Sequence, residues 1–289
     1  MRFWIRIHDW PLWKRWLLKA VVLALTVLIV CFPHPVLLAR HLGHWSEPNA
    51  MIDAESKALD PLVPELMNSL PDGANRDTHP KEILRAVELL VYKKLPYAFD
   101  WDTWGMADYM PTVDEALAMG REDCDGRAVV GASLLKRIGF ESQLRTDGAH
   151  VWVTTPQGDT MGPGKVSMIE TTPTGVKVNT QWLWTMPRIL AVNTGLFPLV
   201  RELIIAVVLW GLLLHPAMRR YRMVVIGTLI IGGLFLLRSG GNLQRGESMT
   251  LVWLGIAALV AALICCRIGG RRKETPEAAT ELGFNPSNN

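Results

Sequence analysis

The stretch REDCDGRAVVGASLLKRIGFESQLRTDGAHVWVTT, residues 121–155, decides the fold of the polar middle of this 289-residue chain. Its apolar residues first recur at helical spacing over 125–138, and Gly139 ends that pattern. They then alternate over 140–146 and again over 150–155, with Asp-Gly between the two runs, which is typical of a β-hairpin. A helix followed by an antiparallel meander predicts an α+β domain.

The residues around this stretch extend the same domain. Pro80 opens a segment, 80–94, whose apolar residues recur at helical spacing, so we expect a helix there. Thr112 and Glu115 have the spacing of a capping box and predict the start of a short helix. Residues 166–171 (VSMIET) predict a third strand of the meander.

Long apolar segments on both sides of the polar middle predict a membrane protein. Hydrophobic residues make up 49% of the chain, and the mean hydropathy is +0.19. Both values are high for a water-soluble domain. Four segments are candidate transmembrane helices: 17–38, 203–218, 223–237 and 249–268.

Basic residues next to these segments predict their orientation. Arginines and lysines flank the first segment on its N-terminal side, and further basic clusters occupy 219–222 and 271–273. Four spans place all three groups in the cytoplasm, as the positive-inside rule requires. The pattern favours an uncleaved anchor over a signal peptide, because no small-residue cleavage site follows the apolar run.

The predicted organisation of this multi-pass inner-membrane protein therefore has four parts. A cytoplasmic N-terminus with the first span precedes an extracytoplasmic domain, three further spans and a disordered cytoplasmic tail, at 1–40, 41–187, 188–270 and 271–289. The net charge of +3 is small. Its excess lies beside the apolar segments, which indicates contact with a lipid bilayer and excludes a nucleic-acid surface.

The cysteines do not form a disulfide framework. Of the four, Cys31, Cys265 and Cys266 lie in apolar segments, and Cys124 alone belongs to the polar middle. A single thiol there has no partner for a disulfide, so reactivity or burial explains it. The charged residues around Cys124 favour reactivity over burial in an apolar core.

Three residues have the order and surroundings that acyl-transfer chemistry needs. Cys124 begins a predicted helix, where unpaired N–H groups favour a thiolate and can bind an oxyanion. His150 opens a strand from which its imidazole could take the thiol proton. Glu170, on the predicted neighbouring strand, could hold the other ring nitrogen. No cofactor is implied, since thiol and imidazole supply the chemistry themselves.

Two carboxylates oppose this activation. Asp123 and Asp125 flank the cysteine, and nearby negative charge raises the pKa of a thiol. We expect a close thiolate–imidazolium pair with His150 to outweigh them, provided that both carboxylates point into solvent.

The segments "PTVDEALAMGREDCDGRAVVGASLLKRIG", "GAHVWVTT" and "MIETTPTG" together resemble the transglutaminase-like superfamily over roughly residues 80–175. The resemblance implies a papain-like fold with Cys124 as nucleophile, His150 as base and an acid as third member. Glu170 stands where Asp is usual, and Glu122-Asp123 replaces the frequent Gly-Asp. Asp159 is the alternative acid, although it lies in a predicted turn.

The sequence thus predicts a membrane-anchored thiol acyl-transfer enzyme acting on a peptide or protein substrate, with hydrolysis favoured over transamidation. The alternative is a catalytically silent domain that binds peptide or cell-wall polymer and scaffolds a membrane assembly. No metal ligand set is predicted: His41 and His44 have the spacing of a ligand pair, but no third ligand accompanies them.

Overall fold

The computed structural model describes residues 10–146, 150–162, 169–172, 175–178, 182–214, 218–241 and 249–268. The described residues form two compact units. One lies between Leu28 and Trp184, and the other combines the residues before Leu28 with those after Trp184. Most of the described residues are helical, and strands occur only in the first unit. We describe each unit separately.

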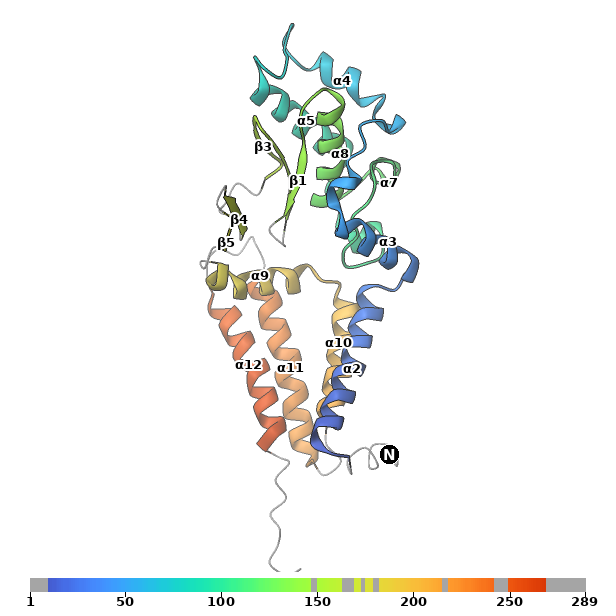
Figure 1. The fold of residues 1–289 in the computed structure, drawn as a ribbon. Coiled ribbons are helices and arrows are strands. Elements are labelled where there is room, and N and C mark those ends of the chain that lie inside the picture. Colours follow the sequence, from blue (N-terminus) through green and yellow to red (C-terminus); the bar gives the residue numbers. More distant parts are fainter. Residues whose placement is uncertain are drawn as a thin grey trace, which may run out of the picture. The chain divides into compact units, whose positions relative to one another are not determined.

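The first unit is built from short helices and a small sheet (Figure 1). Its helical elements are α3 (Pro35–Ser46), η1 (Pro48–Met51), η2 (Lys57–Leu59), α4 (Leu62–Asn68), α5 (Pro80–Lys94), α6 (Asp100–Thr103), α7 (Val113–Met119) and α8 (Cys124–Arg137). Its strands are β1 (Gln143–Thr146), β2 (Val151–Thr155), β3 (Gly158–Thr160), β4 (Ile169–Thr172) and β5 (Gly175–Val178).

Helix α8 forms the centre of this unit. Val129, Val130, Leu134 and Leu135 on this helix are fully buried. They belong to one apolar cluster shared with α4, α5 and the sheet, and α8 contacts α5, α7, β1 and β2. Burying an aliphatic side chain of this size contributes about 1.5–3 kcal/mol. The helix is therefore apolar on nearly all sides along its middle turns.

The helices of the first unit follow the sequence signals closely. Helix α5 spans Pro80–Lys94 with Pro80 in its first turn. The capping box of α7 is present: Thr112 accepts a hydrogen bond from the Glu115 N–H, and the Glu115 carboxylate accepts one from the Thr112 N–H. Both predictions are confirmed.

The sheet differs from the predicted meander in its third strand. Strands β1 and β2 pair antiparallel, with Thr146 opposite Val151, and the predicted Asp147-Gly148 turn lies outside the described residues. Strand β2 then pairs with β3, which begins at Gly158. The prediction that 166–171 supplies the third strand is wrong, because β4 pairs with β5 in a separate two-stranded sheet.

His41 and His44 hold the peptide of Met110. The Met110 N–H donates to Nδ1 of His41 at 3.2 Å, and the Met110 carbonyl pairs with Nδ1 of His44 at 2.6 Å. Two histidines one helical turn apart on α3 thereby fix the chain that leads into α7. Their spacing serves a backbone contact in the described structure.

The second unit consists of apolar helices. These are the described residues of α2 (Leu12–Cys31) up to Val27, followed by α9 (Trp182–Leu196), α10 (Leu199–Leu213), α11 (Arg220–Gly240) and α12 (Thr250–Ile268). By length and composition, α11 can cross a membrane. The bent pairs α2–α3 (91°) and Met186–Leu196 with α10 (113°) raise the number of candidate spans to three if each pair is one span. The apolar part of α12, Thr250–Cys266, is shorter.

Close packing and one ion pair hold the second unit together. Helices α11 and α12 lie side by side, and a Cβ on Gly255 would come within 2.8 Å of the Gly233 carbonyl oxygen (Figure 1). Small residues at such a contact let two helix backbones approach. Glu202 on α10 pairs with Arg238 on α11 at 2.8 Å. This ion pair joins two neighbouring helices of the unit.

Candidate active site

Cys124 is the first residue of helix α8, and Asp123 is its N-cap. The Asp123 carboxylate accepts a hydrogen bond from the Asp125 N–H at 3.2 Å, as N-cap residues do. The Cys124 side chain is half-buried. The backbone N–H of Val151 lies near the Cys124 sulfur and acts to lower the pKa of the thiol. The fold thus brings the Cys124 sulfur to the beginning of β2, beside the residue that follows His150.

The ring of His150 is oriented by a backbone carbonyl. Its Nε2 lies 2.9 Å from the Met161 carbonyl oxygen. A carbonyl oxygen can only accept, so Nε2 carries the proton and Nδ1 is the basic nitrogen of the neutral ring. The ring also stacks on Trp152, with centroids 6.5 Å apart and planes 14° apart.

Met161 was not foreseen as part of the site. It is the one non-glycine residue with a positive φ (60°) among the described residues. A bulky residue in this left-handed region is uncommon and carries strain. Its side chain packs over Gly131, where a Cβ would meet the methionine methyl at 2.6 Å. No sequence signal other than the following Gly162 marks this position.

Of the two candidate acids, only Asp159 has a described side chain, and it bonds to Trp152 and Thr154. The predicted turn is present at Pro156 and Gln157, but Asp159 lies just after it, on β3. Its carboxylate accepts hydrogen bonds from the Trp152 indole at 3.2 Å and the Thr154 hydroxyl at 2.6 Å. Glu170 lies on β4, which is not the strand paired with β2. The Glu170 side chain is outside the described residues, so its role stays a prediction.

Of the two carboxylates that flank Cys124, Asp125 is buried and Asp123 is half-buried, so the expectation that both point into solvent is wrong for Asp125. Asp125 and Asp100 are each 2% exposed, and Glu122 is fully buried. Each has one oxygen fixed by an N–H donor. The Trp104 indole donates to Glu122 at 3.0 Å, the Tyr109 N–H to Asp100 at 2.5 Å, and the Gly126 N–H to Asp125 at 2.9 Å.

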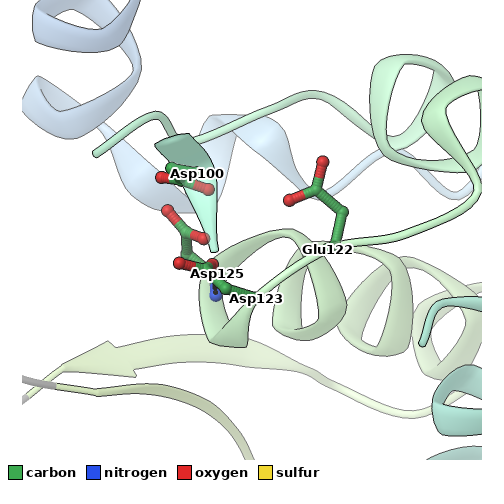
Figure 2. A group of neighbouring side chains, drawn as sticks. All are labelled: Asp100, Glu122, Asp123 and Asp125. Carbon is green, nitrogen blue, oxygen red and sulfur yellow. Dashed lines mark hydrogen bonds between the residues drawn. The ribbon is translucent and has the colours of Figure 1, made fainter. Parts of the chain in front are cut away.

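A short backbone pairing gathers these side chains. Tyr97 and Glu122 form an isolated parallel bridge, in which the Ala98 N–H donates to the Glu122 carbonyl and the Glu122 N–H to the Pro96 carbonyl, both at 3.2 Å. The bridge lays the start of α6 beside the start of α8. Asp100 therefore meets Glu122, Asp123 and Asp125, as Figure 2 shows.

Burial and mutual repulsion raise the pKa values of this group. Burial first, and then the charge of Asp123, raises the pKa of Asp100 to about 9 and that of Glu122 to about 8. Burial and the hydrogen bond and charge of Asp123 also raise the pKa of Asp125 well above its ordinary value. The same two causes, burial and then Asp123, raise the pKa of the Cys124 thiol to about 12. The carboxylates thus oppose ionisation of the cysteine.

No protein-family model, curated protein or solved structure matches this chain. The geometry around Cys124 and the sequence pattern are therefore what indicate a function.

Proposed function

We propose that this protein is a membrane-anchored thiol acyl-transfer enzyme in which Cys124 is the nucleophile and His150 the base. The observation that supports the proposal is the position of the Cys124 sulfur beside the backbone N–H of Val151, which acts to lower the pKa of the thiol. This position brings the first residue of α8 close to the residue that follows His150. A thiol at a helix N-terminus and a histidine at the start of the neighbouring strand are the parts that such catalysis needs.

The proposed reaction proceeds in two balanced steps. The Cys124 sulfur attacks a carboxamide or peptide carbonyl carbon while its proton passes to Nδ1 of His150. The C–N bond then breaks, and the departing amine takes that proton, which leaves a thioester on Cys124. In the second step His150 removes a proton from water, whose oxygen attacks the thioester. The products are a carboxylic acid and the free thiol.

Backbone groups are placed to assist both steps. The Cys124 N–H at the start of α8 can donate to a developing oxyanion. The Met161 carbonyl holds Nε2–H of His150 at 2.9 Å and so keeps Nδ1 as the proton acceptor. In the proposal this carbonyl orients the ring, a task that the sequence pattern assigns to Glu170. The Met161 carbonyl and Glu170 can both orient the His150 ring only if the ring reorients during turnover.

A second function is favoured by a specific observation. Because burial and Asp123 raise the pKa of Cys124 to about 12, the unassisted thiol is almost entirely protonated near neutral pH. An inert thiol suits the alternative of a catalytically silent domain that binds peptide or cell-wall polymer and scaffolds a membrane assembly. The two functions differ in whether His150 activates the cysteine.

Alkylation of Cys124 separates these functions. Cys31, Cys265 and Cys266 are replaced by alanine in the full-length protein, so that Cys124 is the single thiol. An activated thiol should react with iodoacetamide at a rate that levels off near neutral pH. We expect His150→Ala to slow this reaction at least tenfold at pH 7, and His79→Ala, on a half-buried histidine of the same unit, to leave it unchanged. Equal rates in all three proteins would establish the silent domain.

We also propose the membrane topology inferred from charge: both termini in the cytoplasm and the Cys124 unit outside. The support is the set of apolar helices α2, α10, α11 and α12 together with the basic residues that flank them. A reporter that is active only in the cytoplasm, fused after Asn289, should be active. Activity of a periplasmic reporter at the same position would overturn the topology.

A further inference from the structure

A group of four acidic side chains, Asp100, Glu122, Asp123 and Asp125, lies where α6 meets the start of α8. One carboxylate oxygen from each lies within 4.8 Å of the others (Figure 2). The proposed reaction uses none of these side chains as acid or base. Their arrangement therefore needs an explanation of its own.

Three of the four carboxylates have an oxygen that is buried and has no hydrogen-bond partner. These atoms are Oδ1 of Asp100, Oε2 of Glu122 and Oδ2 of Asp125, and their side chains are all more than nine-tenths buried. A buried oxygen without a hydrogen-bond partner destabilises the fold, and more so where the group is charged. Three such atoms in one group indicate that a ligand completes their bonding.

Among the described residues, no basic side chain neutralises the group. None of its carboxylates takes part in an ion pair. The two nearest arginines in the sequence bond elsewhere: Arg121 donates to the Asp102 carbonyl, and Arg127 donates to the Leu95 carbonyl and stacks on Tyr97. The described residues therefore supply no positive charge that balances the group.

The shape of the group fits a calcium ion. Calcium binds oxygen at about 2.3–2.6 Å, so that two ligands on opposite sides of the ion lie about 4.6–5.2 Å apart. Four oxygens within 4.8 Å of one another fit inside one such sphere. Magnesium binds at about 2.0–2.1 Å and retains several waters, and an all-carboxylate, buried set of ligands suits it less.

Gly126 makes room for this arrangement. A Cβ at this position would come within 2.6 Å of Glu122 Oε2, the oxygen that lacks a partner. The Glu122 carboxylate can therefore reach the first turn of α8 only because residue 126 has no side chain. The helix N-terminus favours negative charge there, but four carboxylates exceed what one helix end stabilises.

We propose that Asp100, Glu122, Asp123 and Asp125 bind one divalent cation of the calcium class. Each carboxylate supplies one oxygen, while the donors from Trp104, Tyr109 and Gly126 hold the second oxygens of Glu122, Asp100 and Asp125. The site does not depend on the proposed acyl-transfer activity, and its test measures binding alone.

Terbium, which replaces calcium at oxygen sites, is the probe. The full-length protein in detergent is freed of metal with EDTA, and Tb³⁺ luminescence is recorded on excitation of tryptophan. The Trp104 indole, 3.0 Å from Glu122, should sensitise the bound ion. We expect saturation at one ion per chain and displacement by Ca²⁺ at concentrations where Mg²⁺ has no effect. Absence of a saturable signal would overturn the proposal.

Single charge-neutral variants identify the ligands. Asp100→Asn and Asp125→Asn should each weaken Tb³⁺ binding at least tenfold, since each removes one anionic oxygen. Asp102→Asn is the matched control, because Asp102 lies on α6 with an exposed side chain. Equal affinities in the Asp102 and Asp125 variants would disprove the assigned ligands.

Thermal unfolding keeps the test decisive if a variant is poorly folded. In EDTA, Asp125→Asn should unfold at a higher temperature than the native protein, because it removes repulsion within the group. Added Ca²⁺ should then raise the unfolding temperature of the native protein and leave that of the variant unchanged. A variant that is destabilised in EDTA and still stabilised by Ca²⁺ would contradict the proposal.

Discussion

Replacement of Gly126 by alanine tests whether Glu122 is packed against α8 as the structure shows. The added Cβ would lie 2.6–2.7 Å from Oε2, Cδ and Cγ of Glu122, so the whole carboxyl end of that side chain must move. Glu122 is fully buried, and Trp104 holds its other oxygen. Overpacking of this kind costs about 1–3 kcal/mol. Alanine in a helix gains about 1 kcal/mol over glycine, which offsets part of that cost.

Gly43→Ala is the matched control. Gly43 lies within α3 in the same unit, and a Cβ there would have nothing within 4 Å. This variant should gain the helix propensity alone, about 1 kcal/mol. The two variants should therefore differ by about 1–3 kcal/mol, which corresponds to about 2–12 °C in the unfolding temperature of a domain of this size.

The assay is thermal unfolding of the full-length protein in detergent and EDTA, followed by tryptophan fluorescence. A double-mutant cycle with Glu122→Ala locates the cause, because the cost of the Gly126 change should vanish once the Glu122 carboxylate is gone. If Gly126→Ala and Gly43→Ala raise the unfolding temperature equally, Glu122 does not lie against α8. The geometry of the carboxylate group would then be refuted.

Three further changes probe the same region. In EDTA, Asp123→Asn should lower the pKa of Cys124 from about 12 and speed its alkylation at pH 8 by about tenfold per pKa unit; an unchanged rate would contradict the assigned cause. Asp100 binds its proton more tightly when folded, with a pKa near 9 against an ordinary 3.8, so its contribution to stability is present at low pH and is lost as pH rises. In EDTA, Asp100→Asn should consequently stabilise the protein relative to the native chain by an amount that grows between about pH 4 and pH 9. Thermal melts across that range measure this difference, and a difference that does not change with pH would refute the prediction. Thr112→Ala should cost about 1 kcal/mol in chemical unfolding by removing the N-cap of α7, whereas an effect near zero would show that the cap is dispensable.

The helices were predictable because local patterns specify them. Helix α5 has a proline in its first turn and an apolar stripe, and both of its ends match the sequence-based expectation. Helix α8 begins at Cys124, one residue before the expected range, because Asp123 and not Cys124 is the N-cap. These signals lie within a few residues of each other and need no knowledge of distant contacts.

The third strand and the orientation of His150 could not be predicted in this way. Strand β3 spans Gly158–Thr160, which is too short to show alternation. Its place depends on pairing with β2 and on a hydrogen bond from the Thr160 hydroxyl to the Leu84 carbonyl in α5. The partner of the His150 ring is a backbone carbonyl, at Met161. A carbonyl is present at every residue, so composition carries no signal for it.

The burial of the carboxylates is where the sequence misled most, and the reason is physical. Charged residues in a run normally face water, since burying an unpaired charge costs several kcal/mol. Here the bridge between Tyr97 and Glu122, which are separated in the chain by α6 and α7, overrides that tendency and encloses Asp100 with the residues that flank Cys124. A fold that accepts this cost needs protons or a cation to neutralise the group. Protons would leave the buried oxygens of Asp100, Glu122 and Asp125 only partly bonded, whereas one calcium ion would contact them all. The same feature that weakens the case for an unassisted thiol is therefore the strongest argument that the domain binds a metal.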